Sequence, residues 1–263
     1  MLLLAAALVP ATALPATAVA RTVSAEPAVA QTVTAAGPEH RAVALGTPRR
    51  PVAIPDPSRA GSLVAPPPRA PEPAVTAAGT LVVVNKQRPL EPLDYAPHHL
   101  GAVAGTDVEL REDAAAAADR LLADAERAGV PMLPRSGFRS YETQVATYAH
   151  WEDVLGSAEA DVQSARPGYS EHQTGLALDV LPADGTCQAF GCFGDTPQAA
   201  WLAEHAPDYG FVVRYQDGQE DVTGYTAEPW HLRYVGAATA ADVAASGARS
   251  LEEYFGLPAA PTY

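Results

Sequence analysis

The segment SEHQTGLALD, residues 170–179, combines a predicted strand with polar side chains that could form a functional site. His172 and Asp179 stand on either side of Gly175, and the apolar residues that alternate along residues 176–180 predict a half-buried strand after this glycine. A loop that turns into this strand would bring the imidazole and the carboxylate together. Taken alone, such a pair is also compatible with ordinary hydrogen-bonded side chains.

A second segment, EPWH at residues 228–231, can complete a metal site. His231 offers a second imidazole, and Glu228 offers a carboxylate three residues before it. A zinc hydrolase needs three protein ligands, an open fourth position for water, and a base that takes the proton of that water. We therefore expect His172, Asp179 and His231 to hold one Zn²⁺ ion, with Glu228 as the general base.

Three ordered sequence blocks carry a resemblance to a known family. They are SGFRSYETQ at residues 136–144, the pattern SxHxxGxAxD at 170–179, and EPWHLRYVG about fifty residues further on. Together they resemble the VanY-type D-alanyl-D-alanine carboxypeptidases, which are LAS zinc metallopeptidases acting on bacterial peptidoglycan. The resemblance covers residues 81–236. It implies the α+β LAS/Hedgehog-like peptidase fold, with a small, mainly antiparallel sheet flanked by helices, and removal of the terminal D-alanine from peptidoglycan stem peptides.

The block at residues 136–144 supplies candidate substrate-binding residues. The guanidinium of Arg139 suits either a peptide carboxylate or the oxyanion of the scissile carbonyl, although residue type alone favours an ordinary salt bridge. The resemblance assigns Arg139 to the substrate and makes Gln144 a hydrogen-bonding neighbour of the bound peptide. Ser170 is expected to orient a metal ligand or to contact the substrate.

The N-terminal third of the chain differs in composition from the rest. Residues 1–20 carry no charge and are typical of a secretory signal peptide, although the positively charged residues that usually begin such a peptide are missing. The alternative is an apolar linker. Residues 21–78 contain 11 prolines and no sustained periodicity, which predicts a disordered spacer. Residues 79–263 are then the catalytic domain. We expect a secreted, cell-wall-associated monomer.

Charge and hydropathy exclude several classes of partner. The formal net charge is −14, and because the spacer carries about +2 the domain carries about −16. A protein that binds duplex nucleic acid needs the opposite balance, and tight binding to anionic lipid is disfavoured too. No apolar run reaches the roughly twenty residues that span a bilayer, so we expect no stable membrane insertion after signal cleavage.

Periodicity and capping signals predict the scaffold. Helices are expected at residues 111–128, at 140–150 with Ser140 as N-cap, at 196–205, at 239–246, and at 250–255 with a capping box of Ser250 and Glu253. Strands are expected at residues 81–84, at 130–138 as an irregular or edge strand, at 211–215, and at 230–235 as the antiparallel partner of 211–215.

Cys187 and Cys192 are the two cysteines of the chain. In an exported protein such a pair is most simply a disulfide. Closing so small a loop contributes about 2 kcal/mol, so its expected role is to fix a loop near the site.

Three alternatives to the carboxypeptidase interpretation stay open. The chain could make a different cut in the same polymer, as a D,D-dipeptidase, an L,D-carboxypeptidase or a peptidoglycan endopeptidase. It could be a non-catalytic cell-wall-binding module. It could also be an adhesive surface protein whose proline-rich region is the functional part.

Overall fold

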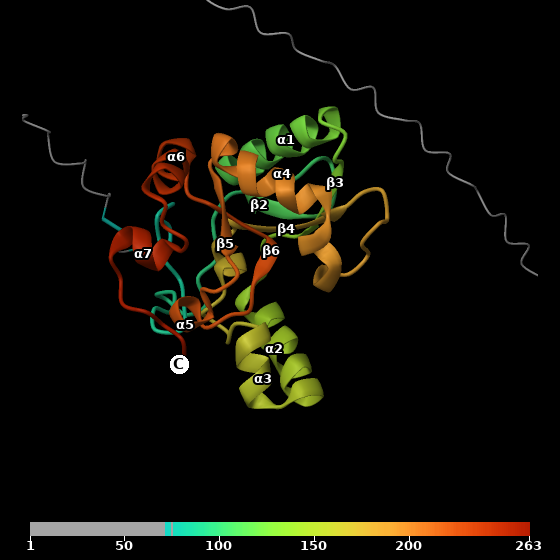
Figure 1. Cartoon of the computed structure of the whole chain (residues 1–263). Coiled ribbons are helices and arrows are strands. Elements are labelled where there is room, and N and C mark those ends of the chain that lie inside the picture. Colours follow the sequence, from blue (N-terminus) through green and yellow to red (C-terminus); the bar gives the residue numbers. More distant parts are fainter. Residues whose placement is uncertain (1–71, 75) are drawn as a thin grey trace, which may run out of the picture. The chain divides into compact units, whose positions relative to one another are not determined.

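The computed structural model describes residues 72–74 and 76–263, which belong to one compact unit, Val64–Tyr263 (Figure 1). The predicted signal peptide at residues 1–20 and most of the predicted spacer at 21–78 lie outside the described residues. At the end of that spacer, Ala77 is 5% exposed and packs on the main core. None of the helices in the described part is long and apolar enough to cross a membrane.

Four antiparallel strands form the central sheet, in the order β3-β4-β6-β5. They are β3 (Met132–Ser136), β4 (Ala177–Pro182), β5 (Phe211–Tyr215) and β6 (Glu228–Tyr234). A separate two-stranded sheet joins β1 (Leu100–Ala102) to β2 (Glu109–Arg111). The predicted small antiparallel sheet is confirmed, including the pairing of β5 with β6.

The strand predicted at residues 81–84 is wrong, because this segment makes no strand ladder. Its carbonyl groups accept hydrogen bonds from arginine side chains instead. Arg233 Nη2 donates to the carbonyl of Val82, and Arg88 Nε donates to that of Val83 at 3.4 Å. Arginine side chains therefore donate the hydrogen bonds that these carbonyl groups would otherwise accept from a neighbouring strand.

Helices flank the sheet (Figure 1). The α-helices are α1 (Glu112–Arg127), α2 (Tyr141–Leu155), α3 (Ser157–Gln163), α4 (Pro197–His205), α5 (Glu220–Thr223), α6 (Ala237–Ser246) and α7 (Leu251–Phe255). Short 3-10 turns are η2 (Glu171–Thr174), η3 (Phe190–Asp195) and η4 (Ala206–Tyr209). The sequence did not predict α3, and α2 runs five residues beyond its expected end.

Two of the predicted helix caps are present. Ser140 Oγ accepts the N–H of Thr143 at 3.2 Å, and Ser250 Oγ accepts the N–H of Glu253 at 3.1 Å. The capping box at Ser250 is only half formed, because the Glu253 carboxylate accepts the N–H of Arg249. The Ser250 cap is therefore present at the start of α7 without the reciprocal bond.

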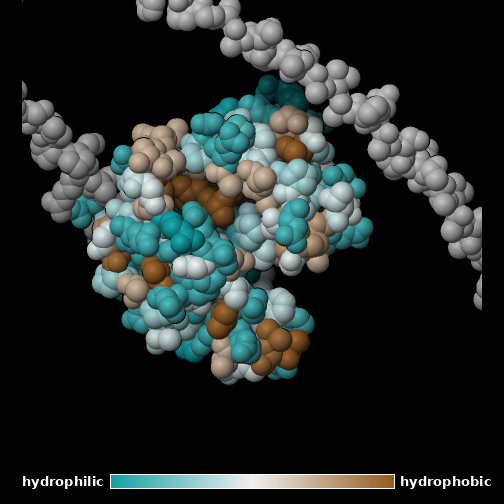
Figure 2. Space-filling model, in the orientation of Figure 1, coloured by the Kyte–Doolittle hydropathy of each residue, from teal (hydrophilic) through white to brown (hydrophobic). Residues whose placement is uncertain are grey.

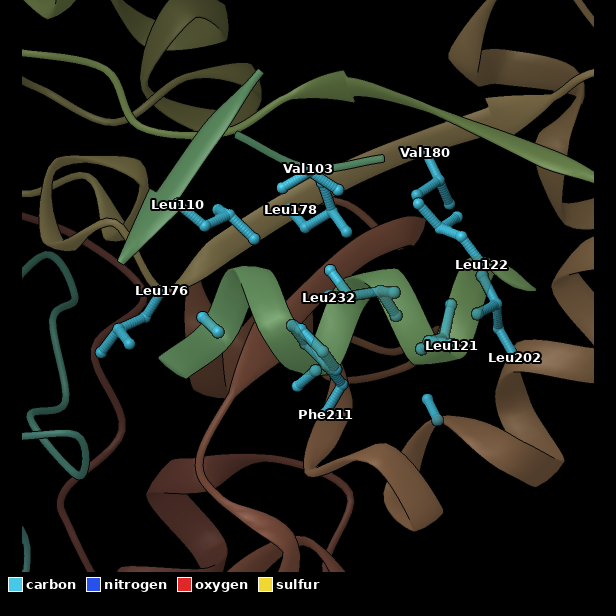
Figure 3. Packing of buried hydrophobic residues seen from close by; sticks show 14 of the residues in the cluster. Val103, Leu110, Leu121, Leu122, Leu176, Leu178, Val180, Leu202, Phe211 and Leu232 are labelled. Carbon is cyan, nitrogen blue, oxygen red and sulfur yellow. The ribbon is translucent and has the colours of Figure 1, made fainter. Parts of the chain in front are cut away.

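The main hydrophobic core lies between α1, α4 and one face of the sheet (Figure 3). Leu121 and Leu122 of α1 contribute to it together with Leu202 of α4, and the strands supply Leu178 and Leu232. Alanines line the buried side of α1, so the helix can lie close to the strands. On β4, Asp179 stands between the core residues Leu178 and Val180, so its side chain faces away from the main core.

A second, smaller hydrophobic cluster joins β5 to α6 and α7. It includes Val212, Val243 and Leu251, among others. Elsewhere the surface also exposes large apolar side chains, and Figure 2 shows hydrophobic residues gathered on the α2–α3 pair. Those of α2 are Val145, Trp151, Val154 and Leu155.

Two irregularities interrupt the sheet, one at each of its outer strands. The register between β3 and β4 shifts between Pro134 and Ser136, and the register between β5 and β6 shifts between Val213 and Tyr215. Side chains alternate along a regular strand, so neighbours point to opposite faces. An extra residue breaks this rule locally and re-aims a side chain. Both irregularities lie beside the cleft described below.

Candidate metal centre

His172 is held by the backbone of the SGFR block. It lies on η2 and is 5% exposed. Its Nδ1–H donates to the carbonyl of Gly137 at 2.7 Å, which leaves Nε2 as the free lone pair, 3.2 Å from Asp179 Oδ2. A side chain at Gly137 would lie 2.3 Å from the carbonyl oxygen of Glu109, so this approach needs glycine.

The sheet register brings the other two predicted ligands together. Asp179 of β4 pairs directly with His231 of β6. Asp179 Oδ1 lies 3.1 Å from His231 Nδ1, and the two imidazole rings of His172 and His231 are 5.0 Å apart and almost perpendicular. Each of the three residues can offer one ligand atom such that all three atoms lie within 4.8 Å of one another.

This cluster fits a zinc ion by its chemistry and by its unsatisfied groups. Two imidazole nitrogens and one carboxylate oxygen form a donor set typical of zinc hydrolases. All three residues are buried, and Asp179 Oδ1 has no hydrogen-bond partner among the described residues. A buried carboxylate oxygen without a partner is costly unless a cation or donor satisfies it.

Electrostatics in the cluster couple metal binding to proton release. Burial raises the pKa of Asp179, but the neighbouring histidines outweigh it and hold that pKa far below its usual range. Burial lowers the pKa of His231, yet the neighbouring carboxylates of Asp179 and Glu171 together outweigh burial and raise that pKa to about 10. Because only neutral imidazole can be a ligand, a metal ion bound at this cluster would displace a proton from His231.

Glu228 lies at the cluster without being one of the three candidate ligands. Its Oε2 is 3.5 Å from His231 Nδ1. On a regular strand, residues three apart face opposite ways, and the irregularity between β5 and β6 allows both Glu228 and His231 to line the same cleft. Burial raises the pKa of Glu228 to about 7, which suits a group that takes and returns a proton near neutral pH.

Glu171 fixes the far side of His231, and sequence reasoning missed it. Glu171 Oε2 lies 3.4 Å from His231 Nε2. Glu171 Oε1 accepts from Arg214 Nε and from Arg233 Nη1, both at 2.8 Å, and Arg214 also binds Glu252 through two hydrogen bonds. All four charged side chains are fully buried or nearly so. The network orients His231 so that Nδ1 faces the cleft.

One signal for this network was present in the sequence. Arg214 and Arg233 stand inside the apolar strands FVVRY and HLRY, where an arginine needs a buried acid as partner. The sequence does not say which of the many acids that partner is. The fold selects Glu171, directly before His172.

Arg139 and Gln144 form a connected pair at the cluster. Arg139 Nη1 donates to Gln144 Oε1 at 3.0 Å, and the Gln144 amide donates to the carbonyl of Ala165 at 2.6 Å. Gln144 is fully buried, so its hydrogen-bonding groups face the protein and position Arg139. Ser170 is 4% exposed and lines the same cleft.

The cleft has a volume of about 560 Å³ and contains every predicted metal and substrate residue. Its walls also carry residues that the sequence did not single out: Arg135, Trp151, Phe190, Tyr215, Tyr225 and Trp230. The Cys187–Cys192 disulfide is present in the structure. It closes the loop that holds Phe190, whose ring stacks on Trp230 at 4.9 Å. The predicted loop beside the site is therefore one wall of the cleft.

Comparison with known proteins decides the family. The family model for VanY, D-alanyl-D-alanine carboxypeptidase, matches residues 107–237. A Bacillus subtilis protein named as a carboxypeptidase, YodJ, is 38% identical over 186 residues, which cover 66% of each chain. A crystal structure of the L,D-carboxypeptidase DacB from Streptococcus pneumoniae is 46% identical, with a TM-score of 0.58, and the match covers 70% of this chain and 90% of that one.

The chain belongs to the VanY family. A crystal structure of a mutant VanY D,D-pentapeptidase from the VanB-type resistance cassette, in complex with Zn(II), matches 66% of this chain and 98% of that one, with 28% identity and a TM-score of 0.57. The matches to these VanY-fold peptidases confirm the predicted α+β peptidase fold. The chain spans about two thirds of the length of YodJ.

Proposed function

We propose that this VanY-family protein is a zinc-dependent D-alanyl-D-alanine carboxypeptidase that removes the terminal D-alanine from peptidoglycan stem peptides. The observation that carries the proposal is the buried cluster of His172, Asp179 and His231 with Glu228 beside it. The Zn(II) complex of the related pentapeptidase supports the choice of metal. A substrate in the cell wall implies work outside the cytoplasm.

In this proposal the side chains around the scissile bond have separate roles. Zinc held by the three ligands would polarise the carbonyl and acidify a water. Glu228 takes the proton of the attacking water at its carboxylate and then passes it to the leaving amine. Arg139, held by Gln144, stabilises negative charge on the scissile carbonyl or binds the terminal carboxylate.

A second candidate function is an L,D-carboxypeptidase, which would shorten a tetrapeptide instead of a pentapeptide. The 46% identity to the pneumococcal L,D-carboxypeptidase favours it. The metal cluster and the base would serve both cuts equally, because they act on the carbonyl and not on the stereochemistry of the residue before it.

The test is to incubate the full chain with a stem pentapeptide ending in D-Ala-D-Ala, and separately with the tetrapeptide, and to follow the products by mass. Loss of one alanine from the pentapeptide, blocked by a chelator and restored by Zn²⁺, is the expected result. Cleavage of the tetrapeptide alone would move the protein to the second function. Loss of a dipeptide, or cleavage further in, would indicate a dipeptidase or an endopeptidase. Turnover that a chelator does not affect would contradict the metal mechanism.

A further inference from the structure

Arg135 is the residue inserted at the irregularity of β3. Pro134 pairs with Val180 and Ser136 pairs with Asp179, so Arg135 has no partner of its own on β4. Neighbours on a regular strand point to opposite faces, yet both Arg135 and Ser136 line the metal cleft. The bulge therefore aims an arginine side chain into the cleft, opposite the strand position that carries a metal ligand.

Arg135 also differs from every other arginine in the described part of the chain. Each of the others donates to a carbonyl, an amide or a carboxylate: Arg88, Arg111, Arg120, Arg127, Arg139, Arg166, Arg214, Arg233 and Arg249. Arg135 makes no hydrogen bond, ion pair or ring contact with any described residue. Its side chain is exposed at the cleft in a protein of net charge −14. A cation without an internal partner is available for a ligand.

The two arginines of the cleft suit two different anions. Arg139 is half-buried and lines the same cleft as Asp179 and Glu228. Arg139 is therefore placed to contact the end of the substrate peptide that reacts. In a carboxypeptidase only one residue follows the scissile bond, so the terminal carboxylate must stay near the metal cluster. Arg135 is exposed, so it can meet a charge on the part of the peptide that extends outward.

We propose that Arg135 is a specificity-determining residue that binds a carboxylate of the stem peptide upstream of the scissile bond. This inference rests on the proposed function. An arginine at the rim of a cleft forms a partly solvated ion pair worth up to about 1 kcal/mol, which corresponds to about fivefold in binding. The enzyme then prefers stem peptides with a free upstream carboxylate over peptides in which that group is amidated, and the preference lies in KM.

The experiment compares three synthetic stem pentapeptides ending in D-Ala-D-Ala. One has free carboxyl groups at its second and third residues, and in each of the other two one of these groups is a primary amide. Rates are measured at low salt for the wild type, for Arg135→Gln and for the control Arg120→Gln. Arg120 is an exposed arginine of α1 that donates to Ala116 of its own helix and lies outside the cleft.

The wild type and Arg120→Gln are expected to show a KM about fivefold higher for one of the two amides, which identifies the carboxylate that Arg135 binds. Arg135→Gln is expected to lose this difference, with kcat almost unchanged and the same melting temperature as the wild type. Cleavage of all three peptides with equal KM by the wild type overturns the inference and leaves the proposed function intact. A preference that Arg135→Gln retains overturns it as well. If the wild type cleaves none of the peptides, the proposed function fails, and this assignment with it.

Discussion

Replacing Glu171 by glutamine should weaken zinc binding and stability together, while the same change at Glu252 should affect stability alone. Both glutamates are buried acids that share Arg214 as a partner. Only Glu171 also contacts His231 and Arg233. The two variants therefore separate the orientation of a metal ligand from the general cost of breaking a buried ionic network.

The magnitudes follow from these contacts. Glu171→Gln leaves Arg233 without a charged partner, since its remaining hydrogen bonds go to backbone carbonyls. Breaking such a buried pair costs about 3 to 5 kcal/mol of the free energy of unfolding. Loss of the carboxylate behind a ligating histidine weakens metal binding by about 10- to 100-fold. Glu252→Gln should cost a similar free energy, yet leave the zinc Kd within about twofold of the wild type.

The assay measures the two quantities separately. Chemical denaturation in a chelator gives the free energy of unfolding of each metal-free variant, and competition with a chromophoric chelator at a temperature where all variants are folded gives the zinc Kd. An equal loss of zinc affinity in both variants would contradict a specific role of Glu171 at the metal site, because the effect would then come from destabilisation. An unchanged zinc Kd in Glu171→Gln would show that Glu171 does not orient His231.

Three further predictions concern the arginine, the acids and the disulfide. Arg139→Lys keeps a charge but loses the planar fork that binds Gln144, so kcat/KM should fall about 100-fold while the zinc content, measured by atomic absorption, stays the same. Burial raises the pKa values of Glu171 and Glu252, but their charged and hydrogen-bonded partners, Arg214 foremost, together outweigh burial and shift both pKa values below 4.5. The stabilising contribution of these acids is complete above this pH and is lost as the pH falls, so the free energy of unfolding should decrease below about pH 4.5, with a shallower slope in Glu252→Gln. Replacing Cys187 and Cys192 by serine should remove about 2 kcal/mol and raise KM, because the loop carrying Phe190 loses its closure; an unchanged KM would show that this wall does not depend on the disulfide.

Much of the fold could be predicted because its signals are local. Alternation placed Leu178 and Asp179 on opposite faces of one strand, and the helical spacing of small apolar residues located α1. Ser140 and Ser250 cap the helices that their side chains indicated. The residues that hold these elements together lie far apart in the sequence, so their contacts could not be predicted from local patterns.

What the sequence did not show depends on tertiary contacts. An extra residue in a strand leaves no pattern, so neither the position of Arg135 nor the way Glu228 reaches the cleft could be read from residue types. The partner of a buried arginine depends on which acid the fold brings near it, which is why Glu171 was missed. Gln144 was expected at the peptide, and the structure shows that its amide is already bound to Arg139 and Ala165.

The proposed division between three metal ligands and a separate base is tested most directly by measuring zinc content and turnover together in Glu228→Gln. In the proposed site, His172, Asp179 and His231 are the ligands and Glu228 is the separate base. We expect one zinc ion per chain in both the variant and the wild type, and a rate of D-alanine release at least about 100-fold lower in the variant. Loss of zinc from the variant would make Glu228 a ligand, and turnover near that of the wild type would show that another group takes the proton.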